Sequence, residues 1–104
     1  MADASTMSIN IYCSNTECSL GESIIFSRTQ SSGYSLVGEV NVDDSRPKIN
    51  IYEDNTLIES NFNIWNNNYT YTPSTSGTHT IKITGETEYI TINITVNDDV
   101  GGVL

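Results

Sequence analysis

The chain has 104 residues, of which 37% are hydrophobic and 16% charged, and its formal net charge is −9. A chain of this size forms one domain with a hydrophobic core. Because only four residues are Lys or Arg, the composition argues against binding to nucleic acid or anionic lipid, whose phosphates require basic side chains. No stretch approaches the roughly 18 apolar residues of a membrane span, so direct membrane insertion is not expected.

The two ends of the chain differ in composition from its centre. Residues 1–7 are small or polar, and residues 98–104 are polar and Gly-rich. Such segments are typical of linkers or of a chain end appended to a domain. We therefore expect the folded domain to span residues 8–97.

Within this span, apolar residues recur at every second position, which is the period of a strand and not of a helix. In chain order, the residues that share a face are Ile9, Ile11 and Cys13; Ile24 and Phe26; Val40 and Val42; Ile49 and Ile51; Phe62 and Ile64; Tyr69 and Tyr71; His79, Ile81 and Ile83; and Ile90, Ile92, Ile94 and Val96. Turn-forming residues separate these sets, as in "EDN" at 53–55, "TPSTSGT" at 72–78 and "TGETE" at 84–88. The pattern predicts an all-β fold, an antiparallel β-sandwich of seven to eight strands. Residues 29–47 hold either an extra strand around 36–42 or a long loop.

Two cysteines, Cys13 and Cys18, enclose the turn-forming sequence "SNTE". In one extended strand their Cα atoms would lie about 16 Å apart, beyond the roughly 7 Å that a disulfide spans. A bridge therefore requires a turn between them. The sequence leaves open a disulfide or two independent buried thiols.

Four stretches together resemble a known family. They are "SLGESIIFS" (19–27), "INIYEDNTLIES" (49–60), "NYTYTPSTSGTHTIKIT" (68–84) and "ITINITV" (90–96). Their order is similar to that in the bacterial and archaeal immunoglobulin-like repeat domains of large adhesin-like surface proteins. The Cys-x4-Cys pair and the long segment 29–47 depart from the family pattern.

This resemblance implies an immunoglobulin-like, non-enzymatic module that acts as a spacer, a binding domain or both, on the cell surface or otherwise outside the cell. Its partners would be neighbouring domains of a larger surface protein, or host or cell-wall proteins and glycans. Similar domains also occur on phage and virus particles. A virion structural protein, such as a tail or capsid decoration domain, is therefore the alternative.

A second alternative, an accessory carbohydrate-binding module, depends on Trp65. Alternation from Phe62 and Ile64 turns Trp65 outward, next to Asn66, Asn67 and Asn68. An exposed indole can stack on a sugar ring while amides bind its hydroxyl groups. The other interpretation is that the indole covers one end of the core.

The sequence predicts no catalytic residue, cofactor site or metal site. His79 shares a face with Ile81 and Ile83, so we expect a structural role rather than that of a general base. Acidic pairs at 43–44, at 86 and 88, and at 98–99 lie in turns or at the chain end, which leaves Ca²⁺ as an alternative to solvated carboxylates. Two sequons, at Asn68 and Asn93, are candidate glycosylation sites.

Overall fold

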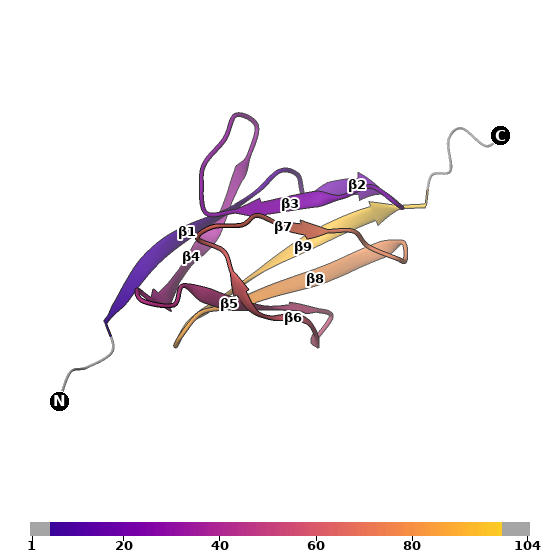
Figure 1. The fold of residues 1–104 in the computed structure, drawn as a ribbon. Coiled ribbons are helices and arrows are strands. Elements are labelled where there is room, and N and C mark those ends of the chain that lie inside the picture. The colour runs from indigo at the N-terminus through magenta and orange to yellow at the C-terminus, as the bar shows by residue number, and fades with distance from the viewer. Residues whose placement is uncertain (1–4, 99–104) are drawn as a thin grey trace.

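The computed structural model describes residues 5–98, which contain nine strands and no helix (Figure 1). The strands are β1 (Thr6–Cys13), β2 (Glu17–Ser19), β3 (Ile24–Ser27), β4 (Ser35–Asp43), β5 (Lys48–Glu53), β6 (Thr56–Asn63), β7 (Tyr69–Tyr71), β8 (Gly77–Thr84) and β9 (Tyr89–Asn97). The prediction of an all-β fold is confirmed.

The strands form two sheets that face each other. One sheet has the order β4-β1-β3-β7 and the other has the order β2-β9-β8-β5-β6. All pairings are antiparallel except that of β2 with β9, which is parallel. The predicted count of seven to eight strands is too low by at least one, because β2 has only three residues and is too short to display alternation.

The first sheet begins earlier in the chain than expected. We expected residues 1–7 to precede the domain, but β1 begins at Thr6, and Met7 is partly buried against the core. Met7 continues the two-residue period of Ile9, Ile11 and Cys13, but it follows a run of small and polar residues whose composition favoured a linker. Residues 1–4 and 99–104, which make up most of the expected end segments, lie outside the described residues.

Of the two alternatives for residues 29–47, the structure has the extra strand. This strand, β4, pairs with β1 along its whole length and forms an edge of its sheet. The turn between β8 and β9 packs on it, because the Asn41 carbonyl accepts a 2.7 Å hydrogen bond from the Glu86 N–H. A Cβ atom at Gly85 would lie 2.1 Å from the same carbonyl oxygen. Only glycine therefore allows the turn to approach β4 so closely.

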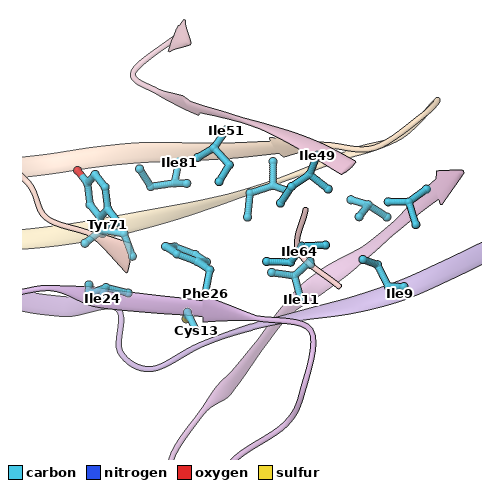
Figure 2. Close-up of a cluster of buried hydrophobic side chains, with 14 of the residues drawn as sticks. Ile9, Ile11, Cys13, Ile24, Phe26, Ile49, Ile51, Ile64, Tyr71 and Ile81 are labelled. Atoms are coloured by element: carbon cyan, nitrogen blue, oxygen red, sulfur yellow. The ribbon is translucent and has the colours of Figure 1, made fainter. Parts of the chain in front are cut away.

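The core lies between the sheets and consists mainly of isoleucine. Figure 2 shows Ile24 and Phe26 of the first sheet pointing toward Ile51 and Ile81 of the second. All four are fully buried. Burial of one such side chain contributes roughly 1.5–3 kcal/mol, so this layer is the main source of stability.

The alternation predicted for β9 is present but does not bury all four inward positions equally. Ile94 and Val96 are buried, whereas Ile90 and Ile92 are partly buried at the margin of the core. The Ile90 side chain lies against Gly38 of β4, which has no side chain to cover it. The inward face is therefore predicted correctly, and its depth of burial depends on the opposite strand.

Candidate functional site

A cluster of hydrogen-bonded polar side chains surrounds the buried His79, at the end of the sandwich where β8 begins. The hairpin turn between β5 and β6 supplies Asp54, whose φ of 50° is left-handed, as is the 71° of Asn55. Two such residues form the tight turn that joins antiparallel strands, so the predicted turn at 53–55 is confirmed. This turn directs the Asp54 carboxylate across β8, where Oδ1 accepts a 2.8 Å hydrogen bond from the Thr80 N–H.

Both ring nitrogens of His79 face acceptors. Nδ1 lies 2.6 Å from Asp54 Oδ2, and Nε2 lies 2.8 Å from the Thr75 carbonyl oxygen. A neutral imidazole has one N–H and can serve only one of these acceptors, whereas the imidazolium serves both. The hydrogen bond to Asp54, followed by that to Thr75, accordingly raises the pKa of His79. The same bond lowers the pKa of Asp54.

A second polar contact joins the two sheets next to His79. The Tyr71 hydroxyl of β7 donates a hydrogen bond to the Glu53 carboxylate of β5. Burial, then this bond to a carboxylate, raises the pKa of Tyr71. Within residues 5–98 no buried side-chain polar atom lacks a partner, so this end of the core is polar but fully hydrogen-bonded.

The arrangement of Thr75, His79 and Asp54 superficially resembles a nucleophile, base and acid. The Thr75 hydroxyl lies 3.1 Å from His79 Nε2. That nitrogen already donates to the shorter, 2.8 Å bond with the Thr75 carbonyl, so it cannot accept the hydroxyl proton. The geometry supports a structural role for His79. The sequence could not identify Asp54 as its partner, since the two residues are 25 positions apart.

Trp65 lies in the turn after β6 and is 40% exposed. The carboxamide of Asn63 fixes this turn, because its Oδ1 accepts hydrogen bonds from the N–H groups of Trp65 and Asn66. The Arg28 guanidinium lies 3.6 Å from the centre of the indole ring, and Arg28 Nε donates to the Trp65 carbonyl. One face of the indole is therefore covered, a contact that the sequence did not predict.

A hollow of about 380 Å³, which we call the Trp65 hollow, adjoins the indole. It is lined by Met7, Asp44, Ser45, Pro47, Asn63, Trp65 and Asn66. Of the four predicted carbohydrate contacts, the structure brings Trp65 and Asn66 to this hollow. Asn67 and Asn68 do not line it, and Asn67 Nδ2 donates to the Asn63 carbonyl.

Cys13 and Cys18 are buried in opposite sheets, on β1 and β2, and both are free thiols. Between them the chain bends at Ser14 and Thr16 as it crosses from one sheet to the other, and Asn15 Oδ1 accepts a 2.8 Å hydrogen bond from the Thr16 N–H. The disulfide that the sequence left open is not formed in the structure. Burial raises the pKa of both thiols, which leaves little reactive thiolate at neutral pH.

The acidic turns do not converge. Among residues 5–98, no group of three or more His, Cys, Asp or Glu side chains lies close enough to hold a metal ion. Asp43 is engaged by Ser45, whose N–H and hydroxyl donate to it and lower its pKa. Asp99, half of the last acidic pair, lies outside the described residues.

Both sequon asparagines, Asn68 and Asn93, are exposed. Asn93 lies on the outer side of β9, where its Oδ1 accepts a hydrogen bond from Thr80. Both amides can be reached from solvent, so glycosylation stays a prediction.

Comparison of the chain with protein-family models, with curated proteins and with solved structures found no match. In the part of the chain that the structure describes, no helix is long and apolar enough to cross a membrane. What the domain does must therefore be inferred from its own residues.

Proposed function

We propose that this chain is a non-enzymatic, immunoglobulin-like module of a cell-surface, adhesin-like protein. In that protein it acts as a spacer outside the cell, links neighbouring domains and transmits tension between them. The proposal depends mainly on where the chain enters and leaves the sandwich.

The strand order supports an immunoglobulin-like topology. Apart from β4 and the three-residue edge strand β2, the orders β1-β3-β7 and β9-β8-β5-β6 correspond to A-B-E and G-F-C-C′ of that fold. β4 is then an additional strand in the connection between β3 and β5, the strands that correspond to B and C. This is the segment in which the sequence also departs from the family pattern.

His79 provides a second point of similarity. Immunoglobulin-like domains often hold a tyrosine near the start of strand F, whose hydroxyl bonds to the backbone a few residues upstream. Here His79 lies near the start of β8 and bonds to the carbonyl of Thr75, four residues upstream. The imidazole takes the place of the phenol in joining the loop to the strand.

The observation that carries the spacer role is the position of the terminal strands. β1 begins at one end of the long axis of the sandwich, and β9 ends at the opposite end (Figure 1). Copies joined end to end would extend in a line, and tension along that line would act parallel to β1 and β9. The hydrogen bonds that pair β1 and β9 with their neighbouring strands would then be loaded together, in shear. They would not break one at a time.

The parallel pairing of β2 with β9 adds to this resistance. It joins the early part of the chain to the last strand through the pairs Glu17↔Thr95, Cys18↔Val96 and Ser19↔Asn97. Flanking hydrogen bonds of 2.9 Å join Thr95 to Thr16 and Leu20 to Asn97.

Single-molecule force spectroscopy tests the spacer role. A tandem array pulled through its two ends should unfold domain by domain at high force. Pulling between the end of β9 and a cysteine placed at Asn55, in the β5–β6 turn at the same end of the sandwich, loads the strands across their length and should require less force. Equal and low unfolding forces in the two directions would contradict the proposal.

Genomic context distinguishes the surface protein from the virion alternative. Tandem copies of the pattern "GES…NYTYTP…GTHTI" in the encoding reading frame support a surface stalk. Neighbouring tail or portal genes would instead assign the sandwich to a phage or virus particle.

A further inference from the structure

The outer face of the five-stranded sheet carries aromatic, basic and hydroxyl side chains side by side. Lys82 and Thr84 of β8 alternate with buried isoleucines and therefore point away from the core. Strand pairing places their neighbours in two rows. These are Leu57–Tyr52–Lys82–Thr91 and Asn50–Thr84–Tyr89. We call these seven residues the outer platform.

Lys82 is held at the centre of the outer platform by two aromatic rings. Its Nζ lies 4.8 Å from the ring centre of Tyr52 and 5.5 Å from that of Tyr89. Both distances are within the range of cation–π attraction. Among residues 5–98, the side-chain ion pairs within 4.0 Å are those of His79, so no carboxylate of this region neutralises Lys82.

The outer platform continues into a hollow of about 360 Å³ at the end of β8. The two surfaces share Asn50 and Thr84, and Arg46 and Lys48 also line the hollow. Neither Arg46 nor Lys48 has a carboxylate within 4.0 Å among the described residues. Three of the four basic residues of a chain with net charge −9 therefore lie on one continuous surface.

Two carboxylates, Asp43 and Glu86, also line the hollow. Asp43 Oδ1 accepts two hydrogen bonds from Ser45, at 2.9 Å and 2.8 Å, so it is already engaged within its own turn. Glu86 is exposed in the turn that packs on β4. With Lys82 included, the surface carries three positive and two negative side chains.

A break in the β5–β6 ladder shapes the same hollow. The register shifts between Ile49 and Ile51, and Asn61 takes a left-handed φ of 55°. Its N–H donates to Asn50 Oδ1 over 2.9 Å. Bulges of this kind redirect side chains, and here the redirected carboxamide of Asn61 lines the hollow.

We propose that the outer platform and the adjoining hollow bind a saccharide chain that carries carboxylate groups, such as a polymer of uronate residues. The tyrosine rings stack on the apolar faces of the sugars. The threonine and asparagine side chains exchange hydrogen bonds with the hydroxyl groups. The three cations pair with the carboxylates.

An acidic peptide fits this surface less well. A peptide adds to a sheet through main-chain hydrogen bonds at an edge strand. At the centre of the outer platform β8 is already paired on both sides, with β5 and β9. Only side chains are available there, and hydroxyls, carboxamides and aromatic rings match sugars. The proposal goes beyond the spacer role and does not depend on it.

Calorimetric titration of the whole chain with oligogalacturonate tests the proposal. The same oligosaccharide with its carboxylates methyl-esterified and a poly-glutamate peptide of equal charge are titrated in parallel. We expect binding of oligogalacturonate, weaker binding of the ester and weaker binding of the peptide. Lys82→Gln should weaken oligogalacturonate binding roughly tenfold, the effect of losing one charge-assisted hydrogen bond, and Lys82→Arg should preserve most of it.

Arg28→Gln is the matched control, because it removes the same charge from the chain at a position next to Trp65. Binding by Arg28→Gln should equal that of the wild type, and circular dichroism should show that each variant is folded. The proposal is overturned by absence of binding in the wild type, by equal affinity for the ester or the peptide, or by equal losses in Arg28→Gln and Lys82→Gln. Loss of binding in Trp65→Ala but not in Lys82→Gln would also overturn it, since the ligand would then occupy the Trp65 hollow.

Discussion

The two faces of β8 and β9 come from the same 17 strand residues but have opposite relations to the rest of the molecule. On the inner face Ile81, Ile83 and Ile94 are fully buried against the opposite sheet. On the outer face Lys82 and Tyr89 meet each other and solvent. One side of each strand therefore determines whether the domain folds, and the other is available for binding.

This difference follows from the two-residue period of a strand. A shift of one residue exchanges core for water, so neighbouring positions should respond very differently to the same substitution. His79 is the exception on the inner face. It is polar, and it remains buried because all of its acceptors lie within reach.

The largest effect is expected where a charge enters the inner face. Ile94→Asp should cost more than about 4 kcal/mol and leave the domain unfolded, because the carboxylate would have no partner in the core. Asn93→Asp, one residue away, should change the free energy of unfolding by less than about 1 kcal/mol. Urea denaturation followed by circular dichroism measures both. Similar losses would mean that both faces of β9 are covered.

A smaller effect is expected for the polar position of the inner face. His79→Gln should lower the free energy of unfolding by about 2 kcal/mol, because it removes hydrogen bonds between charged groups and their acceptors. The matched control is Thr78→Ala, at the adjacent outward position, which should cost less than about 1 kcal/mol. A silent His79→Gln would show that the contacts with Asp54 and Thr75 contribute little.

The same residue should make stability depend on pH. The pKa of His79 is raised in the folded state above its ordinary value of 6.5. Its contribution is therefore fully present below pH 6.5 and is lost as the pH rises through the folded pKa. The pKa of Asp54 is lowered from 3.8, so its contribution is present above pH 3.8 and is lost as the pH falls through the lower folded value.

Thermal unfolding at a series of pH values measures this dependence. Stability should decline above pH 6.5 in the wild type, and this decline should be absent in His79→Gln. An increase in wild-type stability above pH 6.5 would contradict the imidazolium assigned to His79.

On the outer face the expected cost is smaller still. Lys82→Gln should lower the free energy of unfolding by only about 0.5–1 kcal/mol, the contribution of a cation–π contact at an accessible site. A loss of several kcal/mol in the free energy of unfolding, measured by urea denaturation, would mean that Lys82 stabilises the fold and is not available to bind a ligand.

Reduction should have no effect on stability. Cys13 and Cys18 are free thiols, so dithiothreitol should leave the unfolding midpoint unchanged, and Ellman's reagent should count two thiols after denaturation. A disulfide closing so short a loop would contribute about 2 kcal/mol, and a drop of that size on reduction would show that a bridge had formed.

Much of the fold could be predicted from the sequence because the signals are local. Alternation identified the inward residues of β5, β8 and β9, and the turn at Asp54 followed from its residue types. β2 could not be predicted, since three residues carry no period and its partner β9 lies far along the chain. β4 remained one of two alternatives, because its exposed first half weakens the alternation.

The candidate sites were harder to predict, because they depend on residues that are distant in sequence. Trp65 could be recognised as outward, but Arg28, which covers one face of its ring, precedes it by 37 positions. Alternation with Ile81 and Ile83 indicates that Lys82 points outward, but not what it contacts. Its position between Tyr52 and Tyr89 became apparent only from the register of three strands.

The division of β8 and β9 into an inner and an outer face is tested most directly by nuclear Overhauser effects in solution. Figure 2 shows Phe26 directed toward Ile51 and Ile81 of the opposite sheet. We predict cross-peaks between the Phe26 ring protons and isoleucine methyl groups of the five-stranded sheet, and between Lys82 and the rings of Tyr52 and Tyr89. Cross-peaks from the Ile81 methyl groups to Tyr89, without any to Phe26, would contradict the account.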